Sequence, residues 1–275
     1  MNELRLVIIG HGFVGKAVDF GFNLHVTKLI IDPKYGNSIA DIKEFNPDVI
    51  FICVPTPSND DSSIDLSLVE GVLTELEVFS QTLIVLKSTI VPSFFKSINN
   101  RYENLVYNPE FLTERNANQD FISQPMLILG GKETYSKKLE YIYKNHSSCH
   151  NCPTLYLSRV EASVVKYAIN SYLATKVTFF NQIYDLVEDC SGDYDKVRKA
   201  ITSDPRITDS HTLVPGHDGK RGFGGACFPK DISAIYLDSD KLTLLKQVAD
   251  INRAYRKAYS LDDRERSQNI KFGDS

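Results

Sequence analysis

The most reactive candidate side chain of this sequence is Cys227, which lies in the segment RGFGGACFPKDI at residues 221–232. Proline is favoured at the first position of a helix, so Pro229 predicts that a helix begins beside the cysteine. The N–H groups and the dipole at a helix N-terminus stabilise a thiolate, and Lys230 adds positive charge. Asp231 would face the same pocket. The pattern predicts a nucleophilic cysteine with an acid–base partner; the alternative is a buried structural cysteine beside a helix cap.

A second candidate site is the glycine-rich turn GHGFVG, which follows an apolar run and precedes a helical stretch. In such a turn Gly10 would permit the tight bend, Gly12 would let a pyrophosphate approach the backbone, and Gly15 would let the helix pack on the strand. The helix N-terminus would offer N–H groups to the phosphates. The turn therefore predicts dinucleotide contacts from Gly10, Gly12, Phe13, Val14 and Gly15.

Asp32 ends the second apolar run, where a carboxylate can bond the ribose 2′-OH of a dinucleotide. This position favours NAD over NADP, although the neighbouring Lys34 weakens the preference. The alternative is an ordinary turn between a strand and a helix.

The elements that must position these residues follow from the hydrophobic pattern. Short apolar runs alternate with polar or mixed helical stretches up to about residue 157, which predicts an α/β fold with a Rossmann-type, doubly wound parallel sheet. Residues 160–190 contain no glycine or proline and predict one long helix. We expect an NAD-binding domain, a mostly helical central and dimerisation domain that carries Cys227, and a frayed polar tail, at 1–157, 158–260 and 261–275.

Composition excludes several classes of protein. The net charge of −4 over 275 residues argues against a general nucleic-acid binder. No apolar run approaches the roughly 20 residues that span a bilayer. Five cysteines without a disulfide framework, and an N-terminus without a signal-peptide layout, favour a reducing, cytoplasmic location. The cluster His146, Cys149, His150 and Cys152 has zinc-site spacing, but we interpret it as an ordinary loop and predict no metal.

The segment GFGGACFPKD resembles the active-site segment of the UDP-glucose/GDP-mannose dehydrogenase family. The motifs GFVG, CVPTP, KSTIVP, NPEFLTE, VKYAIN, FFNQ and DPRI also occur in family order. The resemblance implies NAD-dependent oxidation of a nucleotide sugar, with UDP-glucose as the best guess, from the C6 alcohol to the carboxylate. It implies that Cys227 captures the aldehyde as a thiohemiacetal, which a second hydride transfer converts into a thioester that water hydrolyses.

The same resemblance implies roles for further residues. Lys166 and Asn170 would polarise the reacting oxygen from one helix face, and Asp231 would handle protons with Thr89 and a water. Acidic residues near that water and the nicotinamide would be Glu110 and Glu114. The implied substrate contacts are Phe111, Leu112, Lys166, Asn170, Arg206, Phe223 and Gly224. Beyond the glycine turn, the implied cofactor contacts are Asp32, Thr56, Thr89, Glu114 and Lys230.

The sequence also departs from the family pattern. The chain ends near the start of the C-terminal domain that holds the nucleotide, so we expect a shortened member, and Lys220 with Arg221 could replace lost phosphate contacts. Ser163 stands where the family usually has glutamate. As in relatives, the long helix is expected to pair in a homodimer. Two alternatives are a single-step β-hydroxyacid-type dehydrogenase, which needs no cysteine, and a non-catalytic NAD- or sugar-binding subunit.

Overall fold

The computed structural model describes residues 3–98 and 101–273, which form two compact units. Unit 1 comprises Met1–Thr56 and Asp65–Lys166, and unit 2 comprises Pro57–Ile64 and Tyr167–Ser275. Helix α7 (Arg159–Asp189) begins in unit 1 and continues in unit 2. Within the described residues, no helix is both long and apolar enough to span a membrane.

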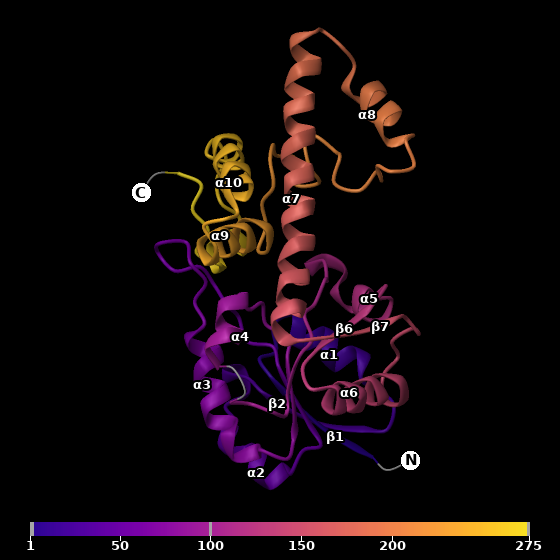
Figure 1. The fold of residues 1–275 in the computed structure, drawn as a ribbon, viewed down its shortest axis with the longest axis vertical. Helices are drawn as coiled ribbons and strands as arrows, with labels where there is room; N and C mark the ends of the chain where they lie inside the picture. The colour runs from indigo at the N-terminus through magenta and orange to yellow at the C-terminus, as the bar shows by residue number, and fades with distance from the viewer. Residues whose placement is uncertain (1–2, 99–100, 274–275) are drawn as a thin grey trace. The chain divides into compact units, whose positions relative to one another are not determined.

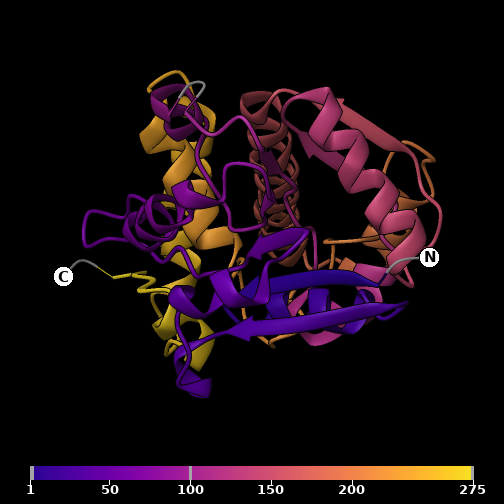
Figure 2. The same ribbon diagram turned by 90° about the horizontal axis from the view of Figure 1, so that it is seen from below.

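Unit 1 is built on one seven-stranded sheet with the order β2-β1-β3-β4-β5-β6-β7 (Figure 1). The strands are β1 (Leu4–Ile9), β2 (Val26–Ile31), β3 (Val49–Ile52), β4 (Leu83–Leu86), β5 (Leu105–Tyr107), β6 (Leu127–Gly130) and β7 (Thr154–Leu157). Figure 2 shows β1 and β2, in indigo, running side by side in parallel. The predicted α/β fold is therefore confirmed.

The sheet differs from the prediction at one end. β5 and β6 pair antiparallel through Tyr107 and Gly130, whereas the other neighbouring strands are parallel. The sequence did not predict β7, because this edge strand has only four residues and is too short to show a hydrophobic pattern. Its Leu155 and Tyr156 are exposed. The sheet is thus mostly parallel, with a short β6–β7 pair added in the opposite direction.

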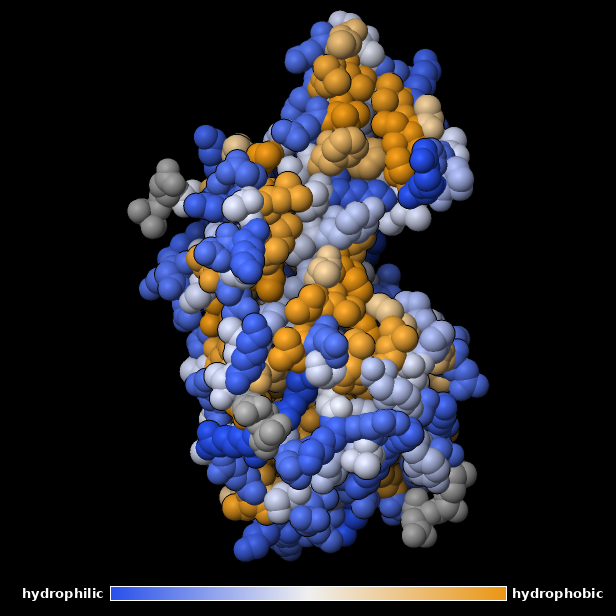
Figure 3. Space-filling model, viewed as in Figure 1, coloured by the Kyte–Doolittle hydropathy of each residue, from blue (hydrophilic) through white to orange (hydrophobic). Residues whose placement is uncertain are grey.

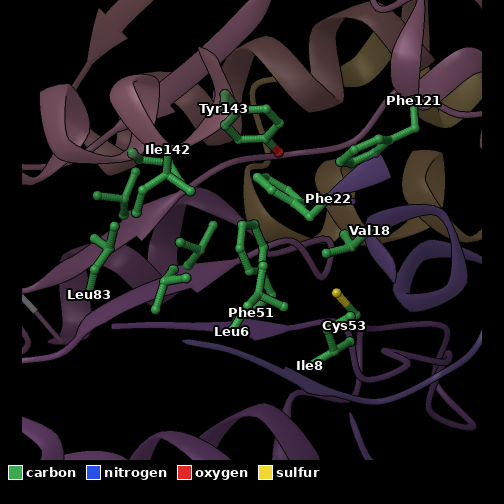
Figure 4. Packing of buried hydrophobic residues seen from close by; sticks show 14 of the residues in the cluster. Leu6, Ile8, Val18, Phe22, Phe51, Cys53, Leu83, Phe121, Ile142 and Tyr143 are labelled. Atoms are coloured by element: carbon green, nitrogen blue, oxygen red, sulfur yellow. The ribbon is translucent and has the colours of Figure 1, made fainter. Parts of the chain in front are cut away.

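Helices cover both faces of this sheet. They are α1 (Phe13–Gly21), η1 (Pro33–Tyr35), η2 (Ile39–Asp41), α2 (Ile42–Phe45), α3 (Ser67–Glu75), η3 (Leu76–Phe79), α4 (Pro92–Ile98), η4 (Glu114–Asn116), α5 (Ala117–Ile122) and α6 (Glu133–His146). Residues from β1, β3, β4 and β6 form one core with α1, α5 and α6. In that core Phe22 packs on Phe51 and Tyr143, with ring centroids 5.1 and 4.9 Å apart (Figure 4). This core fixes the strand ends that carry the candidate site.

Unit 2 is helical. After α7 it contains α8 (Tyr194–Thr202), α9 (Phe228–Asp238), α10 (Thr243–Arg256) and α11 (Asp263–Ser267). One core packs Ala174 of α7 against Ile232 of α9 and Val248 of α10, and a second joins Phe180 and Tyr194. The long helix predicted at 160–190 is present, and Leu186 near its C-terminal end is exposed.

Residues 261–273 are folded against unit 2, which corrects the expectation of a frayed tail for the described part of 261–275. Asp262 and Glu265 form a capping box at the start of α11, and Glu265 is fully buried. Ile270 and Phe272 are also buried. The segment packs on the loop at 57–64, where the Ser58 N–H donates to Gln268 O at 3.1 Å. Buried partners, rather than hydrophobic periodicity, hold this polar stretch in place.

Candidate active site

The glycine turn between β1 and α1 has the geometry of a phosphate cradle. Gly10 has a φ of +88°, and a Cβ on Gly15 would lie 2.0 Å from the carbonyl oxygen of Gly10. The first turn of α1 therefore packs directly on the turn before it. A Cβ on Gly12, by contrast, would lie in open space. Among the described residues, no atom outside its chain neighbours and its own helix would come within 4 Å of that Cβ. The backbone at Gly12 is thus open to a pyrophosphate at the N-terminus of α1.

Asp32 lies just after β2 and is bound by the backbone of this turn. Its Oδ2 accepts the His11 N–H at 2.7 Å, and its Oδ1 accepts the Lys34 N–H at 3.1 Å. These two hydrogen bonds, the one from His11 foremost, hold the pKa of Asp32 below its usual value. A carboxylate here accepts hydrogen bonds from a ribose hydroxyl and repels a 2′-phosphate, so the residues present fit NAD. Thr56, the last residue of this part of unit 1, is buried beyond β3.

Lys166 and Glu110 form a buried ion pair in unit 1. The Lys166 ammonium donates to Glu110 Oε1 at 3.0 Å and to the Glu110 carbonyl at 2.5 Å. It also lies 5.2 Å from the centroid of the Phe111 ring. Glu110 Oε2 accepts the Leu112 N–H at 2.6 Å. The structure therefore brings together four of the predicted site residues, Lys166, Glu110, Phe111 and Leu112.

A cavity of about 310 Å³ lies beside this group and is lined by Glu110, Phe111 and Leu112. The other two residues predicted from unit 1 differ in exposure. Thr89 is half-buried between β4 and α4, and Glu114 is exposed at the start of η4. Glu110 rather than Glu114 is thus the carboxylate held in a buried, paired position.

Lys87 also lines this cavity and was not among the predicted site residues. Its ammonium donates to Asn108 Oδ1 at 2.9 Å and to the Asn108 carbonyl at 3.1 Å. Burial lowers the pKa of Lys87 to about 8. Burial likewise raises the pKa of Cys53, a neighbour of Lys87, to about 12. This pair places two titratable groups in the interior of unit 1.

In unit 2 Cys227 is the N-cap residue of α9, as the Pro229 signal predicts. One turn later, the Asp231 N–H donates to the Cys227 carbonyl at 2.8 Å. The Asp231 carboxylate accepts Asn170 Nδ2 at 2.6 Å on one oxygen and Lys230 Nζ at 2.6 Å on the other. Asn170, Lys230 and Asp231 are all buried. The structure thus places Cys227 at a helix N-terminus, one turn before a carboxylate that is bound by a buried amide and a buried ammonium.

The glycine-rich segment before Cys227 is held by side chains that the motif did not point to. Asn252 accepts the Phe223 N–H at 2.7 Å and donates to the Phe223 carbonyl at 2.9 Å. The Phe223 side chain is buried in the core of unit 2, so it supports the segment. Glu265 accepts the Gly225 N–H at 3.1 Å. The sequence signal that could have indicated Glu265 is the capping-box pair Asp262 and Glu265.

Two family models match the chain. The NAD-binding domain of the UDP-glucose/GDP-mannose dehydrogenase family matches residues 34–147, and the central domain of that family matches residues 160–254. The chain belongs to the UDP-glucose/GDP-mannose dehydrogenase family. This membership confirms the resemblance and gives NAD as the cofactor of the first domain. The first match begins after the glycine turn, so the assignment of the turn rests on its geometry.

The curated relatives that the chain matches are longer than the chain. The UDP-glucose 6-dehydrogenase of Rickettsia bellii is 34% identical over 210 residues, which cover 70% of this chain and 47% of that protein. The chain spans about half the length of the curated relatives it matches. The structure of a UDP-glucose dehydrogenase from Pyrobaculum islandicum aligns with a TM-score of 0.75 at 24% identity, over 94% of this chain and 68% of that one.

A 3-hydroxyisobutyrate dehydrogenase of Mycobacterium tuberculosis also aligns, with a TM-score of 0.66 at 17% identity, over 98% of this chain and 97% of that one. Identities this low show a shared fold alone. The fold alone therefore does not distinguish this family from that dehydrogenase.

Three residues that depart from the family pattern or were expected to contact the substrate have hydrogen-bond or ion-pair partners within their own unit. Ser163, at the usual glutamate position, is buried and donates to the Ile90 carbonyl at 2.5 Å. Arg221 donates to Asn181 Oδ1 at 2.8 Å and to Asp185 at 2.6 Å, so its guanidinium has partners within unit 2. Arg206 is 86% exposed and pairs with Asp204.

The histidine–cysteine cluster near residue 150 is used structurally. His146 Nδ1 lies 3.1 Å from the Leu24 carbonyl, and Cys149 Sγ donates to the Phe121 carbonyl at 3.4 Å. Within the described part of the chain, no three histidine, cysteine or acidic side chains are grouped as metal ligands. All five cysteines are thiols.

Proposed function

We propose that this chain is an NAD-dependent dehydrogenase that oxidises the C6 alcohol of a nucleotide sugar to the carboxylate in two hydride transfers. UDP-glucose is the best candidate substrate. The observation that carries the proposal is the position of Cys227 at the N-terminus of α9, one turn before an Asp231 carboxylate bound by Asn170 and Lys230. Family membership and the name of the Rickettsia bellii relative support it.

The mechanism begins with removal of the alcohol proton, which we assign to Asp231. NAD, held by the glycine turn and Asp32, would accept one hydride in each of the two oxidations. The aldehyde carbon then bonds to the Cys227 sulfur while its oxygen gains a proton, which gives a thiohemiacetal. Loss of the second hydride and of that proton gives a thioester. Water then breaks the carbon–sulfur bond, which releases the carboxylate and restores the thiol.

Lys166 and Asn170 supply donors for the oxygen that carries negative charge in these steps. In this structure both donors are held by carboxylates: Lys166 by Glu110, and Asn170 by Asp231. Donors preset in this way lose little freedom when a substrate oxygen arrives, since the side chains are already ordered. The pairing also keeps each buried charge or amide satisfied before the substrate binds.

The stoichiometry of NADH tests this proposal. The full chain is incubated with NAD and, in turn, UDP-glucose, other UDP-hexoses and GDP-mannose. We expect two NADH per sugar consumed, and a Cys227→Ala variant that forms no sugar acid. The absence of NADH with all of these sugars would contradict the proposal.

The alternative activity is a single-step oxidation of a β-hydroxyacid. It needs no cysteine nucleophile, and Lys166 on α7 would be its catalytic helix lysine. One NADH per substrate from a β-hydroxyacid, with full turnover in Cys227→Ala, would support this alternative instead.

We further propose that the chain forms a homodimer through α7. Tyr172, Phe179 and Leu186 are spaced by seven residues and are 67%, 51% and 58% exposed. Apolar side chains repeated every seven residues favour pairing of two helices. Figure 3 shows hydrophobic surface over the part of α7 that carries Phe179 and Leu186, next to α8. A second copy of the chain is the occupant that matches this stripe.

A further inference from the structure

Glu265 of the C-terminal segment is buried against the glycine-rich segment that leads to Cys227. Its Oε1 accepts the Gly225 N–H at 3.1 Å and Arg256 Nη2 at 2.6 Å. Its Oε2 accepts the Asp262 N–H at 2.9 Å. Glu265 and Arg256 are 0% and 1% exposed. Both carboxylate oxygens are therefore used, one of them on the backbone two residues before the thiol.

The glycine-rich segment is shaped to admit this ion pair. A Cβ on Gly224 would lie 2.2 Å from Arg256 Nη2 and 2.4 Å from Glu265 Oε1. A side chain at that position would push the pair away from the backbone. Gly225 has a φ of +79°, a conformation that glycine adopts readily and that other residues disfavour. The hydrogen bond from its N–H to Glu265 holds this one conformation among the many open to glycine.

Arg256 completes the arrangement from α10. Its Nη1 donates to Asp218 at 2.6 Å, so the guanidinium bridges Glu265 to the stretch that precedes the glycine-rich segment. A buried ion pair adds little net stability when compared with well-packed apolar side chains, because both ions lose their hydration. Its contribution is better explained by geometry, since it holds one backbone conformation.

We propose that Glu265 is a positioning residue for Cys227: by fixing the Gly225 N–H and anchoring Arg256, it sets the backbone path that places the thiol at the N-terminus of α9. The expected effect of Glu265 on kcat rests on the proposed function. Its expected effect on the backbone at Gly225 does not. The proposal gives one residue of the C-terminal segment, Glu265, a role in positioning the thiol.

The test compares Glu265→Ala and Glu265→Gln with Asp262→Ala in the full chain. Asp262→Ala removes the other half of the capping box and weakens α11, but leaves the acceptor for Gly225. Hydrogen exchange of the peptide that contains Gly225 should accelerate by about tenfold or more in Glu265→Ala, as for an opened segment, and stay near wild type in Asp262→Ala. Glu265→Gln keeps one acceptor oxygen and should lie between wild type and Glu265→Ala.

The kinetic readout is kcat with the accepted nucleotide sugar. Glu265→Ala should lower kcat by about 100-fold, the loss expected from a misplacement of about 1 Å, with the KM for NAD unchanged. Wild-type exchange at Gly225 in Glu265→Ala would overturn the proposal, as would an equal fall of kcat in Asp262→Ala. If the wild-type protein oxidises no nucleotide sugar, the proposed function fails, and the exchange comparison alone decides whether Glu265 positions the segment.

Discussion

Asn170 and Asp231 are joined by a 2.6 Å hydrogen bond from Nδ2 to Oδ2, although 61 positions separate them in the sequence. The bond links α7 to the start of α9 inside unit 2. The second Asp231 oxygen is taken by Lys230. Each oxygen of the Asp231 carboxylate therefore has a hydrogen-bond donor before any substrate is present.

The first prediction concerns the free energy of unfolding. Asp231→Ala should lower it by about 3–5 kcal/mol, because it leaves Lys230 buried without its partner. The matched control is Asp204→Ala, which removes an aspartate paired with the exposed Arg206 and should cost about 0–1 kcal/mol. Urea unfolding at pH 7 measures both. Equal losses in the two variants would contradict the buried pairing.

The second prediction separates two glycines of the same turn. Gly15→Ala should destabilise the protein by about 3 kcal/mol, because its Cβ would collide with the Gly10 carbonyl. Gly12→Ala should leave stability near wild type but weaken NAD binding by about tenfold or more, because the open space above it is where the pyrophosphate approaches. Thermal unfolding with and without NAD gives both readouts. A Gly12→Ala protein that NAD stabilises as well as wild type would exclude this cradle.

The roles of this turn were predictable because the motif fixes local geometry: three glycines between a strand and a helix have few solutions. The proximity of Asp231 to Cys227 also follows from their spacing across a helix start. Glu265 was not predicted because the stretch around it is polar, and burial of a polar side chain leaves no hydrophobic periodicity. The partners of Arg221 were not predicted either, because they are polar side chains of a helix turn about 40 residues earlier in the sequence.

The third prediction concerns pH and Lys87. Burial lowers its pKa to about 8, whereas in the unfolded chain it is about 10.4. The unfolded state therefore binds the proton more tightly, which lowers the free energy of unfolding. This loss is fully present below about pH 8 and disappears as the pH rises to about 10.4. The unfolding free energy of wild type relative to Lys87→Met should rise by about 3 kcal/mol across that range.

Urea unfolding of both proteins from pH 7 to 10.5 measures this difference. Cys53 has the opposite effect, because burial raises its pKa to about 12 and stability falls as the unfolded thiol ionises above about pH 9. Both proteins contain Cys53, so its contribution largely cancels in the comparison. A difference that does not change with pH would show that Lys87 keeps its ordinary pKa.

The fourth prediction concerns assembly. Phe179→Glu places a charge in the exposed stripe of α7 and should convert a dimer into a monomer. Leu244→Glu makes the same change at an exposed position of α10, where Leu244 is 65% exposed, and should leave the dimer intact. Sedimentation velocity distinguishes the two states. A monomeric wild-type protein, or equal dissociation of both variants, would contradict pairing through α7.

The loop at 57–64 belongs to unit 2 although it lies between β3 and α3 of unit 1. Asp60 in this loop pairs with Lys271 at 2.9 Å, and Asn269 donates to the Ser58 carbonyl at 3.0 Å. The chain therefore passes between the units three times. Consider a chimaera in which the part of a relative that corresponds to residues 1–166 is joined to residues 167–275 of this chain. The helical unit would then contain a loop from the relative. A chimaera that exchanges the loop and the C-terminal segment together would keep these contacts matched.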